Sequence, residues 1–156
     1  MAEDRAQCIM STPVGSFLLE EDGIGICRAE FLQEEKERTE PSTALLQEAV
    51  CQLQEYFAGT RREFTLPISV QGTEFQLDDW AALQEIPYGT TCSYQQIAEA
   101  IGRPEAVRAV GMANHANPVS IFIPCHRVIG KNGKLTGYGG GLDRKQFLLD
   151  LEKRFR

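Results

Sequence analysis

The spacing of apolar residues changes along this chain, and that change limits the folds that it can adopt. Residues 7–12, 15–20 and 24–31 alternate apolar and polar positions as β-strands do, with an Asp22-Gly23 turn signal before the third segment. Further along, apolar residues recur at the spacing of helices. We therefore predict an α+β fold, in which a small N-terminal antiparallel sheet with one packed helix joins a mostly helical C-terminal domain.

Two helices follow the predicted strands. Apolar positions at helical spacing predict a helix over residues 42–58, and Gly59 is suited to end it. Thr73 and Gln76 form a capping-box pattern, which predicts a second helix through about residue 86. Proline and glycine interrupt the segment between these helices. The expected organisation is an N-terminal scaffold domain (1–66), a linker (67–72) and a C-terminal domain (73–156).

Charge is distributed unevenly along the sequence, although the net charge is −6. Residues 1–86 carry 6 Lys and Arg against 17 Asp and Glu, whereas residues 87–156 carry 10 against 5. Such asymmetry suggests that the second half faces a polyanion while the first half faces solvent. A solvated basic surface without a partner is the alternative, and charge alone does not decide between the two.

The cysteine and histidine content argues against a disulfide framework and against zinc. The five cysteines are an odd number, widely spaced and without a Cys-x-x-Cys pair, and only two histidines are present. No apolar stretch approaches the ~20 residues needed to span a membrane. The amino terminus lacks the features of a secretory signal. We expect a cytoplasmic protein without a metal or other cofactor.

Residues 93–114 have the pattern of a helix-turn-helix. Ser93 with Gln96 opens a short helix, residues 102–104 form a tight turn, and a second helix is expected over residues 104–114. Two helices joined by a short glycine-containing turn are common in proteins that bind DNA. They are also common in proteins that do not.

Arg108 is expected on the exposed side of the second helix, opposite Val107 and Val110. Ala109 and Ala113 are expected to flank it on that exposed side. Short side chains beside a lone cation let a helix backbone approach a nucleic-acid groove closely. A simply solvated arginine is the alternative, and the basic character of this half of the chain favours DNA.

The segment Pro-Cys-His-Arg-Val at residues 124–128 is the most specific chemical signal in the chain. Pro124 interrupts a β-like apolar run, and the Cys125 thiol is followed at once by an imidazole and a guanidinium. Either group can lower the pKa of a cysteine and favour its thiolate. His126 cannot share the side of Cys125 on an extended strand, so it would act through a turn or a bridging water. Glu152 is either surface salt-bridge material or the group that orients His126.

A turn and a glycine-rich loop flank this segment, and loops of the second kind cradle phosphates or close over a small ligand. Asn117 precedes a proline in a turn signal, where Asn side chains commonly bond their own backbone. Residues 137–141 read Gly-Tyr-Gly-Gly-Gly, which lacks the spacing of a phosphate-binding loop. Tyr138 in this loop either stacks on a planar base or caps the core.

Several segments together resemble the O6-alkylguanine-DNA alkyltransferases, also called methylated-DNA–protein-cysteine methyltransferases. The resemblance is dense over residues 73–152 and loose over residues 1–72, where only the strand-then-helix layout agrees. A Pro-Cys-His-Arg-Val segment after an Asn-Pro turn, preceded by a helix-turn-helix, is highly specific to that family. The segments are IPYGTTCSYQQIAEAIGRPEAVRAVG, NPVSIFIPCHRVIG, TGYGGG and LLDLE.

The resemblance implies a single-turnover DNA repair reaction. Cys125 would attack the alkyl carbon on O6 of guanine and keep the group as a thioether. His126 would take the thiol proton through a water, with its imidazole held by Glu152. Asn117 would brace the active-site turn. The Tyr94 hydroxyl would donate to the guanine as it leaves.

The resemblance also implies how the damaged base is reached. Arg108 would fill the gap that the flipped nucleotide leaves in the duplex, with its helix in the minor groove. The implied partner is double-stranded DNA that contains O6-alkylguanine, bound by a monomer, and O4-alkylthymine is left open as a second substrate. The implied DNA contacts are Arg108, Ala109, Ala113, Ser93, Tyr94, Gln95 and Arg127. The implied base-pocket residues are Val128, Tyr138, Gly139 and Gly140.

The sequence departs from the family pattern in two respects. Both histidines, His115 and His126, lie in the C-terminal half, so the N-terminal zinc site of some family members should be absent. Gly139 stands where some relatives carry serine.

Three rival functions are a damage sensor that binds alkylated guanine without transfer, a helix-turn-helix regulator, and a Cys-His hydrolase or thiol redox enzyme. Cys125 argues against the sensor, because such proteins replace the nucleophile.

Overall fold

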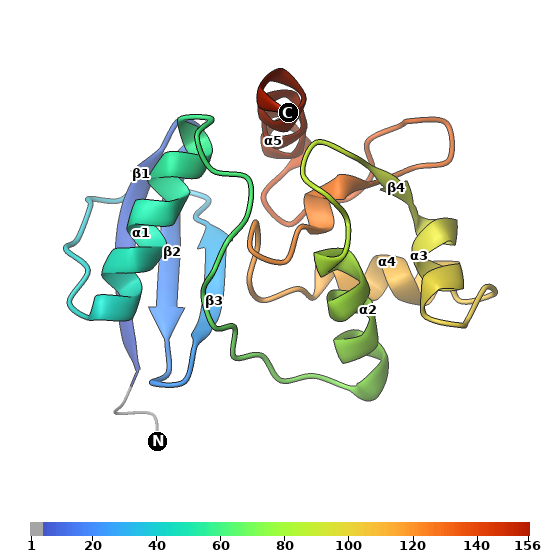
Figure 1. Ribbon diagram of the computed structural model, residues 1–156, viewed down its shortest axis with the longest axis horizontal. Coiled ribbons are helices and arrows are strands. Elements are labelled where there is room, and N and C mark those ends of the chain that lie inside the picture. The colour runs from blue at the N-terminus through green and yellow to red at the C-terminus, as the bar shows by residue number, and fades with distance from the viewer. Residues whose placement is uncertain (1–4) are drawn as a thin grey trace.

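The N-terminal part of the molecule is a three-stranded sheet with a helix on one face. A computed structural model describes residues 5–156 and places antiparallel strands β1 (Ala6–Thr12), β2 (Gly15–Glu21) and β3 (Ile26–Phe31) in the order β1-β2-β3. Helix α1 (Ala44–Phe57) lies beside this sheet (Figure 1). Burial alternates in β1, where Cys8 and Met10 point inward, whereas the central strand β2 is buried on both faces over residues 16–21. The predicted α+β fold is confirmed.

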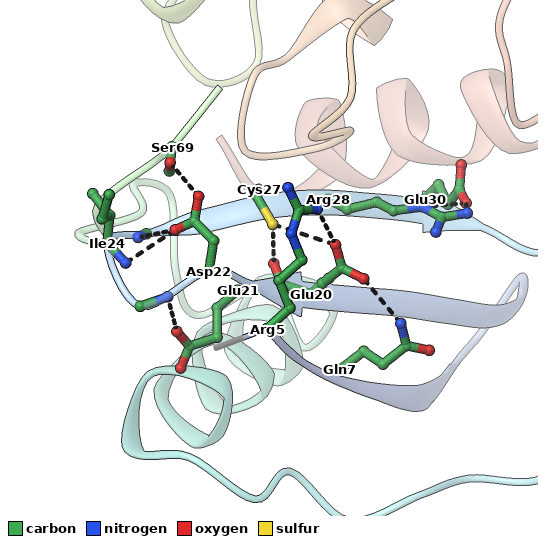
Figure 2. Close-up of polar contacts among 12 residues, drawn as sticks. Arg5, Gln7, Glu20, Glu21, Asp22, Ile24, Cys27, Arg28, Glu30 and Ser69 are labelled. Carbon is green, nitrogen blue, oxygen red and sulfur yellow. Dashed lines mark hydrogen bonds and ion pairs between the residues drawn. The ribbon is translucent and has the colours of Figure 1, made fainter. Parts of the chain in front are cut away.

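Polar side chains close the β2–β3 turn and line the outer face of the sheet (Figure 2). The Asp22 carboxylate accepts the backbone N–H groups of Ile24 (3.0 Å) and Gly25 (3.1 Å), as Asx turns do. These residues belong to the turn, so β3 begins at Ile26 rather than at the predicted residue 24. Ser69 donates to the same carboxylate at 2.6 Å, which ties the turn to the connecting segment.

The free edge of β3 is covered by two segments from elsewhere in the chain. Ile26 exchanges backbone hydrogen bonds with Pro67 and Ser69 at 2.8 and 2.9 Å. Ala29 does the same with Pro118 and Ser120, at 2.9 and 2.8 Å. An uncovered strand edge would be open to pairing with other chains. The second pairing also fixes the backbone a few residues before Cys125, so the sheet helps to position that segment.

Helices dominate the remainder of the chain. They are α2 (Glu74–Gln84), α3 (Tyr94–Ala100), α4 (Val107–His115) and α5 (Leu142–Phe155). Both predicted capping boxes are confirmed, Thr73 with Gln76 before α2 and Ser93 with Gln96 before α3. In Figure 1 the α2–α4 group lies to one side of the sheet, with α5 above the junction.

The second helix of the helix-turn-helix begins later than the sequence predicts. Helix α4 starts at Val107, because the Ala106 N–H closes a separate turn onto the Arg103 carbonyl at 2.9 Å. Pro104 lies in that turn rather than in the first position of the helix. A two-residue parallel pair, β4 (Cys92–Ser93) and β5 (Val128–Ile129), joins the start of α3 to the segment after Cys125. Across residues 5–156, none of the helices has the length and apolar character that crossing a membrane requires.

Candidate active site

Cys125 lies on a tight turn rather than on a strand. It begins a single 3-10 turn, η2 (Cys125–Arg127), in which the Arg127 N–H donates to the Pro124 carbonyl at 3.0 Å. Just before it, Ile121 has a φ of 73°, a costly conformation for a β-branched residue. Backbone strain of this kind often occurs at functional sites. The directions of the Cys125 and His126 side chains are therefore set by this turn and not by the strict alternation of an extended strand.

His126 and Glu152 form a buried pair beneath this turn. His126 Nε2 lies 2.6 Å from Glu152 Oε2, and neither side chain is exposed to solvent. Burial lowers the pKa of His126 and outweighs the attraction of the carboxylate, so the imidazole is neutral near pH 7. A neutral ring that donates from Nε2 keeps its lone pair on Nδ1. That Nδ1 atom is buried and has no hydrogen-bond partner.

The Glu152 carboxylate accepts hydrogen bonds from several parts of the chain. Burial by itself would raise the pKa of this carboxyl, but the charges and hydrogen bonds of His126 and Arg127 outweigh it and hold that pKa well below its usual range. Tyr56, from α1, donates its hydroxyl to Oε2 at 2.6 Å, and the Gly89 N–H donates to Oε1 at 3.2 Å. Glu152 therefore orients His126 and is not part of a surface salt bridge.

Arg127 does not lie where a DNA contact requires it. Its guanidinium is buried and donates to Glu152 at 2.8 and 3.1 Å and to the Ile86 carbonyl at 2.8 Å. All of these partners are internal, so the structure corrects the expectation that Arg127 faces DNA. Its buried partner lies 25 residues away in the sequence, where no local pattern reveals it.

The Cys125 thiol is protonated in this closed state. Burial raises its pKa, whereas the Asn117 side chain and the charge of Lys145 act in the opposite direction without prevailing. This corrects the expectation that the neighbouring imidazole lowers the pKa of the resting thiol. Asn117 braces the turn: its amide donates to the Ile123 carbonyl at 2.8 Å and its carbonyl accepts the Val119 N–H at 2.9 Å. The thiol needs a base to remove its proton.

A cavity of about 110 Å³ adjoins Cys125. It lies between the active-site turn, strand β3 and the glycine loop, by which we mean residues 130–141. Val128 is fully buried in β5 and Tyr138 is largely buried, and neither lines this cavity. Gly139 and Gly140 of the glycine loop form one side of the cavity. Its walls include Cys125, Asn117, Gly139, Gly140, Glu30 and Phe31.

The helix-turn-helix presents an exposed face beside the site. Arg108 is exposed, as predicted, and Ala109 is half-buried. Ala113 is only 3% exposed, because it lies three residues after Val110 on the inward stripe of α4; the expectation that it is exposed was wrong. Met112, which sequence reasoning missed, is 74% exposed one turn after Arg108.

The residues that begin α3 make contacts within the chain. The Ser93 hydroxyl caps the helix by accepting the Gln96 N–H at 3.1 Å. Gln95 is exposed, and its amide donates to the Pro104 carbonyl at 2.8 Å. The Tyr94 hydroxyl lies 2.7 Å from the Thr136 hydroxyl of the glycine loop. Tyr94 therefore contacts the loop that covers the cavity, rather than Cys125 itself.

The fold and the site together define a class of protein in which a helix-turn-helix lies next to a cysteine with a buried His–Glu pair. Among residues 5–156, no group of three or more His, Cys, Asp or Glu side chains is placed to hold a metal ion. Residues 74–154 match the family model described as "6-O-methylguanine DNA methyltransferase, DNA binding domain". Residues 8–70 match the one described as "6-O-methylguanine DNA methyltransferase, ribonuclease-like domain". The chain belongs to the 6-O-methylguanine DNA methyltransferase family.

Individual relatives agree with this assignment. A methylated-DNA–protein-cysteine methyltransferase of Methanosarcina acetivorans is 48% identical over 149 residues, which cover 92% of this chain and 96% of that protein. The constitutive enzyme of Bacillus subtilis is 50% identical over 151 residues, covering 91% and 92%. The Mycobacterium tuberculosis O6-methylguanine methyltransferase structure is 44% identical, covers 97% and 94% of the two chains, and superposes with a TM-score of 0.88. The same enzyme in complex with DNA is 46% identical with a TM-score of 0.88 and covers 96% and 93%. The resemblance seen in the sequence is confirmed.

Proposed function

We propose that this protein repairs DNA by transferring an alkyl group from O6 of guanine in duplex DNA to the sulfur of Cys125. The observation that carries the proposal is the unpartnered Nδ1 of His126, held in the neutral tautomer by Glu152 next to a protonated thiol. A base of this kind is what a buried cysteine needs before it can act as a nucleophile. The relatives are named methylated-DNA–protein-cysteine methyltransferases, which agrees with this reaction.

The residues present account for each proton moved and each bond made or broken in the transfer. His126 Nδ1 takes the thiol proton through a bridging water, and Glu152 stabilises the imidazolium that forms. The Cys125 sulfur then forms a bond to the alkyl carbon while the bond from that carbon to O6 breaks. The departing guanine takes a proton from the Tyr94 hydroxyl, which must first release Thr136. A thioether has no route back to a thiol here, so each chain reacts once.

Access to the alkyl group requires flipping, because a cysteine within a protein pocket cannot reach it while the nucleotide is paired and stacked in the duplex. We place α4 against the minor groove, with Arg108 in the gap that the nucleotide leaves. We expect Ser93, Gln95 and Ala109 to contact the backbone of the duplex. Gly139 and Gly140 line the cavity, and movement of their loop would admit the base together with the backbone of Val128 and the ring of Tyr138. Ala113 supports α4 from the inside.

We further propose that residues 73–156 are the DNA-binding and alkyl-transfer unit, that residues 1–66 are a scaffold unit and that 67–72 link them. Residues 1–4 of the scaffold unit lie outside the described part of the chain. Cys125, the His126–Glu152 pair and α4 all come from one chain, so the protein is proposed to act as a monomer. Sedimentation analysis with and without a lesion duplex would test this, and a dimer on DNA would contradict it.

Intact-mass analysis tests the proposed reaction directly. Incubation with a duplex that contains O6-methylguanine should add one methyl group per chain, and peptide mapping should place it on Cys125. Cys125→Ser should remove the mass gain. Cys51→Ser is a matched control, because Cys51 is the exposed thiol, and it should leave the gain unchanged. Repeated turnovers, or a methyl group on another cysteine, would refute the proposal.

A further inference from the structure

The N-terminal sheet contributes a wall of the cavity beside Cys125, although the sequence indicates only a scaffold there. Glu30 and Phe31, at the end of β3, line the cavity together with residues of the active-site turn and the glycine loop. Glu30 pairs with Arg28 along the strand, as Figure 2 shows, and both side chains remain partly exposed. Phe31 is largely buried, so it provides the apolar part of this wall.

The Phe31 ring is held from three directions. Phe17 packs edge-on against it, with ring centroids 4.8 Å apart. The Arg144 guanidinium lies over its face at 4.9 Å from the ring centroid. Gly140 packs so closely that an added Cβ would lie 3.0 Å from the ring. Phe17 and Arg144 therefore restrict how far the ring can turn when a bulky group enters the cavity.

Arg144 fixes the same wall to the glycine loop. Its guanidinium donates to the Val14 carbonyl at 2.9 Å and to the Leu32 carbonyl at 3.1 Å, both in the N-terminal part of the chain. It also donates to the Gly140 carbonyl at 3.3 Å. The loop that closes the cavity therefore rests on the sheet at the position of Phe31.

We propose that Phe31 is a specificity-determining residue that limits the size of the alkyl group that Cys125 accepts. This inference rests on the proposed function. The alkyl carbon must meet the Cys125 sulfur, so the remainder of a larger group extends into the cavity of about 110 Å³ that Phe31 bounds. A methyl group has no remainder to place, whereas a benzyl group carries a ring as large as that of Phe31 itself.

Variants of opposite size test the proposal. Phe31→Leu should raise the rate with O6-benzylguanine duplex relative to O6-methylguanine duplex by roughly tenfold, the effect of a small change in an apolar pocket. Phe31→Trp should lower the same ratio. Phe57→Leu is the matched control, because Phe57 is a half-buried ring of α1 that packs against Tyr56 and Phe147 and does not line the cavity. It should change the ratio less than twofold.

The outcomes separate this proposal from the proposed function. Loss of methyl transfer by the unaltered protein would overturn the proposed function. Normal methyl transfer with an unchanged benzyl-to-methyl ratio in both Phe31 variants would overturn the role of Phe31 alone. Equal shifts in Phe31→Leu and Phe57→Leu would also overturn it, since they would reflect general loosening of the N-terminal part of the chain. Where Phe31→Leu does not fold, Phe31→Met has nearly the same volume as leucine in a more flexible side chain and carries the same expectation.

Discussion

Asp79, in α2, is a carboxylate with no exposed surface, and the proposed alkyl-transfer chemistry makes no use of it. The Asn114 amide of α4, with its nitrogen assigned toward Asp79, donates to the two carboxylate oxygens at 2.6 and 3.2 Å. Burial nevertheless raises the pKa of Asp79 to about 7. An unfolded Asp titrates near ~3.9, so the folded state keeps a proton that the unfolded chain releases. This contribution to stability is complete at low pH and is lost as the pH rises through about 7.

Asp79→Asn should therefore stabilise the protein in a pH-dependent way. At pH 8 the free energy of unfolding should rise by roughly 1–3 kcal/mol, because each unit of pKa shift is worth about 1.4 kcal/mol and Asn114 already offsets part of the cost. The gain should shrink as the pH falls toward 5. Urea unfolding at several pH values measures it. Asp78→Asn is the control, since Asp78 is the exposed neighbour; equal effects of the two substitutions at every pH would contradict the argument.

At the scale of the element, α4 combines a buried stripe with an exposed face of unusual composition. Arg108 and Met112 are exposed one turn apart, while Val110 and Ala113 face inward. Apolar side chains and arginine are the residues that minor-groove proteins commonly insert into DNA. Helix α4 is held from behind by Trp80, whose indole N–H donates to the Ala113 carbonyl at 2.9 Å. The exposed face is thus presented on a fixed support.

Arg108→Ala should weaken repair of a duplex lesion far more than reaction with the free base. We expect a loss of roughly tenfold to a hundredfold with O6-methylguanine duplex, equivalent to about 1–3 kcal/mol. The rate with free O6-benzylguanine should stay within twofold, because no base is extruded in that reaction. Single-turnover rates on both substrates measure the difference.

Arg103→Ala serves as the matched control for this prediction. Arg103 is another exposed arginine, located in the turn before α4, and its guanidinium lies over the Phe75 ring at 5.7 Å from the centroid. Its loss should affect both substrates mildly. Equal losses on the duplex and the free base for Arg108→Ala would remove the argument that this side chain acts within the stack.

Elements defined by local patterns could be predicted from the sequence, and elements defined by distant contacts could not. The capping boxes at Thr73 and Ser93 depend on residues three positions apart, so their spacing reveals them. The burial of Arg127 depends on Glu152, and the wall formed by Phe31 depends on the close approach of Gly140. Neither pairing leaves a signal in the nearby sequence. The raised pKa of Cys125 likewise follows from burial, which the motif does not encode.

In the whole molecule, the acidic and basic parts of the sequence form different structural elements. The acidic residues 1–86 include the sheet and α1, whereas the basic residues 87–156 include α4 and the turn that carries Cys125. A net charge of −6 would oppose binding to DNA if it were spread evenly. Separated charges let one side approach phosphates while the other side faces away.

Binding to DNA should therefore depend steeply on salt. Neutralising about four phosphates would give a slope near −3.6 in a plot of log K against log salt concentration, because each contact releases condensed counterions. Fluorescence anisotropy with an undamaged duplex between 50 and 200 mM salt measures this slope without interference from the reaction. A flat dependence would show that the basic half does not meet the phosphate backbone.

Glu152 serves both the reaction and the stability of the fold. Its carboxylate positions His126 and also accepts a hydrogen bond from the Tyr56 hydroxyl, in the other half of the molecule. A genetic screen for inactive proteins would therefore find this position under-represented among stable, well-expressed variants. Substitutions there would remove the protein from the cell rather than leave an inert copy bound at lesions. A lineage that lost alkyl transfer would therefore be expected to replace Cys125 before it replaced Glu152.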